Sequence, residues 1–126
     1  MMMKRPSKSV FVFGSNTEGR HGKGAALHAR RRYGAIYGQA RGRQHNAYAI
    51  VTKELRSGYS RVQVSDIESE VQEFLAHATS NPTTTFLVTR LGCGLAGFLD
   101  NEIAPLFRGA PTNCILPDEW IGTLHA

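Results

Sequence analysis

Two glycine-rich segments, each directly after a short apolar run, constrain the fold of this chain most strongly. The first occupies residues 14–25 and follows Val10–Phe13, and the second occupies residues 92–98 and follows Phe86–Thr89. Apolar and β-branched runs of this length are typical of strands buried on both faces of a sheet. Glycine is unfavourable inside such elements, but it lets backbone N–H groups come close to a ligand. Both segments are therefore predicted to be loops at strand ends that line a pocket for an anion such as phosphate.

Further apolar runs predict the remaining strands, and helical patterns fill the segments between them. Residues 35–46 are expected to form a loop, and the segment after Pro117 either packs on the sheet or stays free. Strands are expected over 9–13, 47–52, 84–89 and 113–116, and helices over 22–33, 65–81 and 100–107.

The middle helix has the clearest signals of the three. Ser65 and Glu68 match a capping box, an apolar stripe of helical period follows, and Asn81–Pro82 ends it. The last helix is expected to be short or bent, because Pro105 lacks an amide donor.

Strands that alternate with helices predict an α/β fold with three layers, α/β/α, around a mostly parallel sheet. Ligands bind beyond the carboxyl ends of the strands in such sheets. Both glycine-rich segments and Lys53, which follows the second predicted strand, belong to that edge and should line one cleft. We expect a single domain over residues 9–126, preceded by a basic, disordered tail over residues 1–8.

The charge of the chain is unevenly distributed. The net charge is +5, and residues 20–43 hold seven Lys or Arg residues and no Asp or Glu. Such a field favours anionic partners, although Arg30–Arg32 would also suit the last turn of a helix. The two cysteines and five histidines lack metal-ligand spacing, so no metal and no cofactor are expected. No apolar stretch is long enough for a signal peptide or membrane span, so a cytoplasmic protein without membrane contact is expected.

In the first glycine-rich segment, backbone N–H groups at the start of a helix would hold an anion. Asn16 can donate to and accept from a sugar hydroxyl, or it can stabilise its own loop as an Asx turn. The candidate ligand-binding residues of this segment are Gly14, Ser15, Asn16, Gly22, Lys23, Gly24 and Ala25.

The second glycine-rich segment contains no acidic residue, so it could wrap a diphosphate. Phe98 could stack on a ring of the ligand or anchor the turn in the core. Cys93 could act as a nucleophile if a base such as His21 lay beside it, but a small buried cysteine is the simpler interpretation. The candidate ligand-binding residues here are Arg90, Gly92, Cys93, Gly94, Leu95, Ala96, Gly97 and Phe98.

Three of these motifs, taken in order, resemble the macrodomain family. They are Val12–Asn16, Gly22–Ala26 and Thr89–Leu95, and the likeness extends over residues 10–117. Within the family, the chain is most similar to the branch that contains terminal ADP-ribose protein glycohydrolase, because it also has Tyr48–Lys53 at a strand end and Arg90–Leu95 in the later loop.

The resemblance implies a small macrodomain-like fold that lacks the usual N-terminal strand, and ADP-ribose as the ligand. Asn16 would face the distal ribose, and the second glycine-rich segment would wrap the diphosphate. In the hydrolase branch, a lysine at the position of Lys53 attacks the anomeric carbon of the ribose while an aspartate assists. That aspartate is replaced here by Ala96, so the carboxylate would have to come from Asp100 or Glu54.

Three functions remain open at this stage. The first is binding of ADP-ribose or a related NAD-derived nucleotide. The second is removal of ADP-ribose from a protein, a nucleic acid or a small molecule through Lys53 and a carboxylate. The third is nucleic-acid binding through Arg30–Arg32, Arg41 and Arg43.

Overall fold

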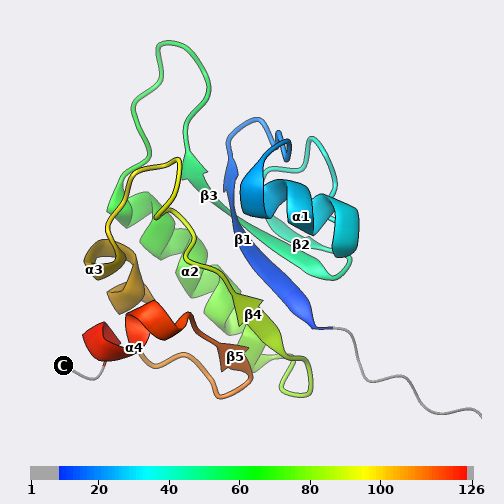
Figure 1. Ribbon diagram of the computed structural model, residues 1–126, viewed down its shortest axis with the longest axis vertical. Helices are drawn as coiled ribbons and strands as arrows, with labels where there is room; N and C mark the ends of the chain where they lie inside the picture. Colours follow the sequence, from blue (N-terminus) through cyan, green and yellow to red (C-terminus); the bar gives the residue numbers. More distant parts are fainter. Residues whose placement is uncertain (1–8, 125–126) are drawn as a thin grey trace, which may run out of the picture.

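The computed structural model describes residues 9–124, which fold around one five-stranded sheet (Figure 1). The strand order is β2-β3-β1-β4-β5, and every neighbouring pair is parallel except β2 with β3. The mostly parallel sheet predicted from the sequence is therefore confirmed. The strands are β1 (Val10–Asn16), β2 (Gly42–Gln44), β3 (Ala47–Lys53), β4 (Phe86–Val88) and β5 (Cys114–Ile115).

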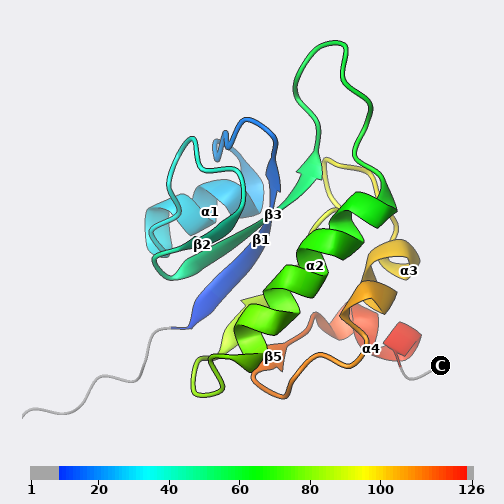
Figure 2. The same ribbon diagram turned by 180° about the vertical axis from the view of Figure 1, so that it is seen from behind.

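Helices cover both faces of this sheet and complete the three layers. Figures 1 and 2 show α1 on one face and α2 on the other. The short α3 continues directly into a 3-10 helix, η1, as expected from Pro105. The helices are α1 (Gly24–Arg32), α2 (Val64–Thr79), α3 (Asp100–Ile103), η1 (Ala104–Phe107) and α4 (Asp118–Leu124).

The two faces of the sheet have cores of different character. On the α2 face, Phe74 contacts the rings of Tyr48, Phe86 and Phe107, and Trp120 packs on Phe107. Burying each aromatic side chain of this kind stabilises the fold by about 2 kcal/mol. On the α1 face the core is small and rich in alanine, which lets α1 lie close to the sheet. Its buried members are Phe13, Ala26, Ala29, Ala35, Ala47 and Ala49.

Three local expectations are wrong. First, β1 extends to Asn16 instead of ending at Phe13, so the glycine-rich segment begins within the strand. Second, the edge strand β2 lies inside the segment expected to be a loop. Third, α2 begins at Val64, and the backbone N–H of Gln63 donates to Asp66 Oδ2 at 2.8 Å, in place of the expected Ser65–Glu68 box. The helix starts earlier because Asp66 supplies an acceptor three residues after Gln63.

The end of the described chain packs against the body of the protein. Trp120, in α4, is fully buried, and its indole N–H donates to Asp100 Oδ1 at 2.7 Å. Of the two alternatives for this segment, packing is the one observed. The tail expected over residues 1–8 lies outside the described residues. Within residues 9–124, no helix has the length and apolarity needed to cross a membrane.

Candidate functional site

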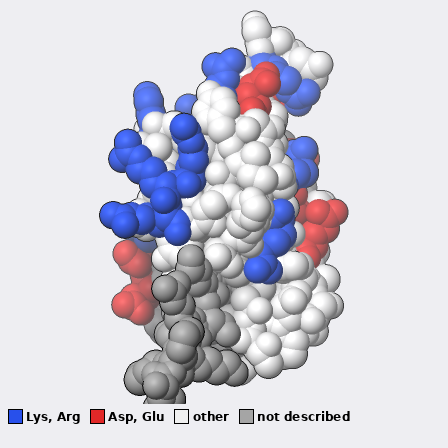
Figure 3. All heavy atoms as spheres, turned by 90° about the vertical axis from the view of Figure 1, so that its right-hand side faces the viewer, with Lys and Arg blue, Asp and Glu red and all other residues white. Residues whose placement is uncertain are grey.

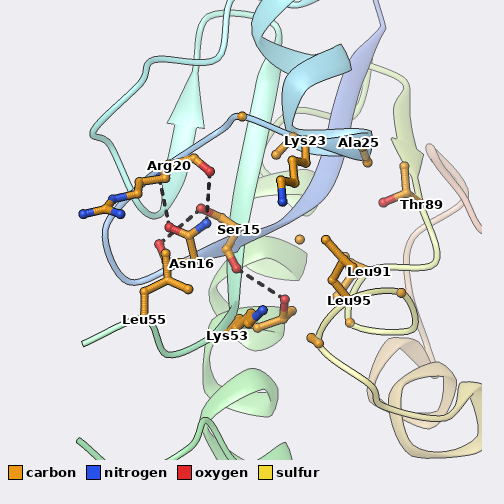
Figure 4. A pocket seen from close by; sticks show the side chains of 18 of the residues that line it. Ser15, Asn16, Arg20, Lys23, Ala25, Lys53, Leu55, Thr89, Leu91 and Leu95 are labelled. Carbon is orange, nitrogen blue, oxygen red and sulfur yellow. Dashed lines mark hydrogen bonds between the residues drawn. The ribbon is translucent and has the colours of Figure 1, made fainter. Parts of the chain in front are cut away.

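A cavity of about 720 Å³ opens at the carboxyl ends of β1, β3 and β4 (Figure 4). Its walls come from the first glycine loop (residues 14–25), the end of β3, and the second glycine loop (residues 92–98). The three segments that the sequence predicts to converge therefore line the same cavity. Its volume lies within the range typical of small-molecule sites.

Most of the candidate residues line this cavity, and four of them do not. Phe98 is buried in the core on the α2 face, so it anchors the turn. Cys93, Gly97 and Asp100 also lie outside the cavity wall. The candidates that line it are Gly14, Ser15, Asn16, Gly22, Lys23, Gly24, Ala25, Lys53, Arg90, Gly92, Gly94, Leu95 and Ala96.

The charged groups of the cavity wall are all positive. The positive residues that line it are Arg20, Lys23, Lys53 and Arg90, and no Asp or Glu among residues 9–124 does so. Arg90 is paired with Asp100, which lies outside the wall, at 2.6 Å. Figure 4 shows Lys23 reaching in from the start of α1, with Lys53 below it at the end of β3. Several cations around a partly enclosed space attract and concentrate anions.

The start of α1 adds backbone donors to this positive surface. Gly24, Ala25 and Ala26 line the cavity, and the first turn of α1 holds no acidic residue. The first amide groups of a helix lack intrahelical acceptors and carry the positive end of the helix dipole. An anion in the cavity would therefore meet free N–H groups as well as side-chain cations.

The two glycine loops come close enough to require glycine. A Cβ on Gly14 would lie 3.3 Å from the backbone N of Gly92 and 3.1 Å from Thr52 Oγ1. Gly92 has a φ of +80°, a conformation that side chains rarely adopt. Gly94 is different, because a Cβ there would meet no atom within 4 Å. The fold itself therefore does not require glycine at this position. The missing side chain at Gly94 leaves open space in the cavity.

Asn16 stabilises the first glycine loop. Its Oδ1 accepts from the Arg20 N–H at 2.9 Å, and its Nδ2 donates to the Arg20 carbonyl at 3.0 Å (Figure 4). Both ends of the amide are therefore occupied within the loop. Of the two interpretations of Asn16, loop stabilisation is the one that its contacts favour.

His21 and Cys93 do not have the environment of a nucleophile and its base. His21 is fully buried, its Nε2 lies 3.1 Å from Ser15 Oγ, and its ring packs edge-on against Phe13. Burial, together with nearby Arg30, lowers the pKa of His21. Burial and the Asp100 carboxylate raise the pKa of Cys93 to about 12, so its thiol stays protonated at neutral pH.

The two carboxylates considered as partners for Lys53 are both engaged elsewhere. Arg56 and Thr17 donate to the Glu54 carboxylate and lower its pKa to about 2. Arg90 and Trp120 do the same for Asp100, whose pKa is also lowered to about 2. Each carboxylate is therefore ionised and paired with an arginine. Neither of them lines the cavity.

Several lining residues were not among the candidates. They are Arg20, Ala26, Tyr37, Thr52, Leu55, Thr89 and Leu91. Four of them lie within the motifs quoted for the family resemblance, and Leu55 follows Lys53 by two residues. The four are Ala26, Thr52, Thr89 and Leu91. Arg20 lies within the first glycine loop and was noted only for its charge. No sequence motif indicates Tyr37. It lines the cavity because the loop between α1 and β2 lies beside the first glycine loop.

Comparison with known proteins finds a likeness at the level of the fold. No protein-family model and no curated protein matches the sequence. A solved structure described as Thermosipho africanus DarTG in complex with ADP-ribose aligns with a TM-score of 0.57 at 18% identity. The alignment covers 88% of this chain and 38% of that one. At this identity the likeness establishes the three-layer fold alone, and the chain spans well under half of its structural neighbour.

Proposed function

We propose that this protein binds ADP-ribose or a closely related NAD-derived nucleotide in the cavity between the glycine loops. The observation that carries the proposal is the charge of the cavity wall. Arg20, Lys23 and Lys53 line it without an ion-pair partner among residues 9–124, and no carboxylate of those residues lines it. A diphosphate is a compact, strongly charged anion that such a wall would favour. That the structural neighbour is a complex with ADP-ribose supports the same ligand class.

The diphosphate is placed by this proposal between the start of α1 and the second glycine loop. Lys23 and the free amides of Gly24 and Ala25 would hold it from one side. The loop at Gly92 and Gly94 would meet it from the other side, where no side chain keeps the ligand away from the backbone.

Binding has more support than turnover. Lys53 lines the cavity, as a nucleophile would, but Ala96 replaces the acid and neither Glu54 nor Asp100 lines the wall. Without a carboxylate at the ribose, the expected hydrolysis lacks its assisting group. If Lys53 does cleave a glycosidic bond, Lys53→Ala should abolish release of ADP-ribose from an ADP-ribosylated protein while ligand binding persists.

Nucleic-acid binding has weaker support, although basic side chains gather on the side of the molecule that carries α1 (Figure 3). Arg41 pairs with Glu70 at 3.3 Å, and Arg43 contacts His77 and donates to the His45 carbonyl. Two of the five arginines in that hypothesis are thus held within the protein.

Calorimetric titration with ADP-ribose, ADP and AMP tests the proposal. Gly94→Val is the informative variant, because the added side chain has room in the fold but projects where the ligand would lie. We expect wild type to bind ADP-ribose and Gly94→Val to bind it at least tenfold more weakly. Gly122→Val is the matched control, since Gly122 is exposed in α4, also has open space around an added Cβ, and is not among the residues that line the cavity. Absence of heat with all three nucleotides would overturn the proposal.

A further inference from the structure

An exposed aromatic side chain forms part of the cavity wall. Tyr37 lies in the loop between α1 and β2, 56% of it is exposed, and it lines the cavity. Figures 1 and 2 show this loop beside the first glycine loop. An exposed aromatic ring in a cavity wall is available to stack on a ligand that enters the cavity.

The backbone on both sides of Tyr37 is fixed by hydrogen bonds. The N–H of Ile36 donates to Gln44 Oε1 at 2.7 Å, and Gln44 Nε2 donates to the Gln39 carbonyl at 2.9 Å. Gln44 is 1% exposed, so a buried amide is fully used in holding this loop. The N–H of Gly38 also donates to the Gly19 carbonyl at 2.8 Å, which ties the loop to the first glycine loop.

The ring of Tyr37 is also supported from within the protein. The guanidinium carbon of Arg30, in α1, lies 5.3 Å from the centre of the Tyr37 ring, within the range of a cation–π contact. Leu55, from the loop after β3, is a further apolar side chain of the wall. A rigid aromatic ring with a fixed backbone loses little conformational entropy when it stacks on a ligand.

We propose that Tyr37 is the stacking platform for the aromatic base of the bound nucleotide. This inference rests on the proposed function and refines its ligand class, because it requires a planar ring joined to the diphosphate. The phosphate groups then lie at the glycine loops and Lys23, and the base lies toward the loop between α1 and β2. This orientation differs from the one that the family resemblance implies, in which Asn16 of the adjoining loop faces the distal ribose. Replacing an aromatic side chain that stacks on a nucleic-acid base weakens binding by roughly fivefold to a hundredfold.

A second tyrosine in the same chain provides the matched control. Tyr59 is similarly exposed, and Arg56 lies 3.9 Å from its ring centre, but Tyr59 is not among the residues that line the cavity. The two tyrosines therefore share exposure and an arginine contact, and differ in their relation to the cavity.

The test is calorimetric titration of ADP-ribose into wild type, Tyr37→Ala, Tyr37→Phe and Tyr59→Ala, with thermal unfolding to show that all are folded. We expect Tyr37→Ala to bind at least tenfold more weakly, and the other two variants to bind like wild type. If wild type binds ADP-ribose and Tyr37→Ala binds it equally well, the stacking proposal is wrong. If the wild-type protein does not bind ADP-ribose at all, the proposed function is wrong, and the stacking proposal that rests on it is wrong as well.

A fluorescence experiment reports the contact itself. In Tyr37→Trp, a base stacked on the new indole should quench its emission when ADP-ribose is added, relative to the background of the buried Trp120. In Tyr59→Trp, ADP-ribose should leave the emission unchanged. Saturable binding with no quenching in Tyr37→Trp, or equal quenching in both variants, would contradict the assignment.

Discussion

The first glycine loop is held by hydrogen bonds among its own polar groups, whereas the second is held by a side chain that is buried in the core. In the first, Asn16 bonds twice to Arg20, and His21 lies against Ser15. In the second, Phe98 is buried in the core and its N–H donates to the Gly92 carbonyl at 2.8 Å.

The difference explains how two loops of similar composition can both present their backbone to one cavity. A loop that contains few apolar residues depends on hydrogen bonds of its own polar groups, and the first loop has them at Asn16 and between Ser15 and the Nε2 of His21. The buried Nδ1 of His21 has no hydrogen-bond partner among residues 9–124. The second loop is shorter and has one large apolar side chain that is buried, Phe98, which fixes it by packing.

The largest change in the free energy of unfolding is expected from a substitution at Phe98. Phe98→Ala should lower the free energy of unfolding by about 3 kcal/mol, because it removes a buried ring and leaves a cavity. Denaturant unfolding measures it, and Leu95→Ala is the control because Leu95 is 78% exposed in the same loop. A loss below about 1 kcal/mol would show that packing does not hold the second loop.

The second effect concerns Gly19. A Cβ there would lie 2.5 Å from the carbonyl carbon of Gly38, and Gly19 has a φ of +63°. Gly19→Ala should therefore lower the free energy of unfolding by about 2 kcal/mol, and it should also weaken nucleotide binding by displacing Tyr37. Gly22→Ala, with open space around its Cβ, should change stability by less than about 0.5 kcal/mol. Equal effects in the two variants would contradict this account.

A smaller effect is expected at Asn16. Asn16→Ala removes both hydrogen bonds to Arg20 and should lower the free energy of unfolding by about 1 kcal/mol. Because the amide holds the loop, stability and ADP-ribose affinity should fall together. A variant with unchanged stability and strongly reduced affinity would show instead that Asn16 acts on the ligand itself.

The smallest effect is a change in pH dependence at Asp100, beside the second glycine loop. Arg90 and Trp120 lower its pKa from 3.8 to about 2, so its stabilising contribution is complete above about pH 4 and is lost as the pH falls toward 2. Unfolding at pH 5 and pH 3 should show a smaller drop in stability for Asp100→Asn than for wild type. The pKa of Glu54 is also lowered to about 2, so Glu54 contributes the same kind of pH-dependent stability loss in both proteins. An identical drop in both proteins would contradict the assignment.

The sequence predicts those parts of the fold that depend on local patterns. Val10–Phe13 is a continuous apolar run because β1 is buried on both faces, and the stripe of α2 faces a core. The convergence of both glycine loops with Lys53 follows from the parallel sheet. These inferences need only the period of the pattern and the direction of the strands.

The remaining features depend on contacts between distant segments. The strand β2 is only three residues long and pairs at the edge of the sheet, so it has no apolar run. Whether Phe98 faces a ligand or the core is decided by Ile103 and Phe107, which lie in the same cluster. Tyr37 lines the cavity because Gly38 bonds to Gly19, a contact between loops that no local pattern encodes.

A crystal structure of the protein with ADP-ribose tests the central claim most directly. We predict that the diphosphate lies between the start of α1 and the second glycine loop, with Lys23 beside it and the adenine ring on Tyr37. An empty cavity at saturating ADP-ribose, or a nucleotide bound outside these two loops, would contradict it.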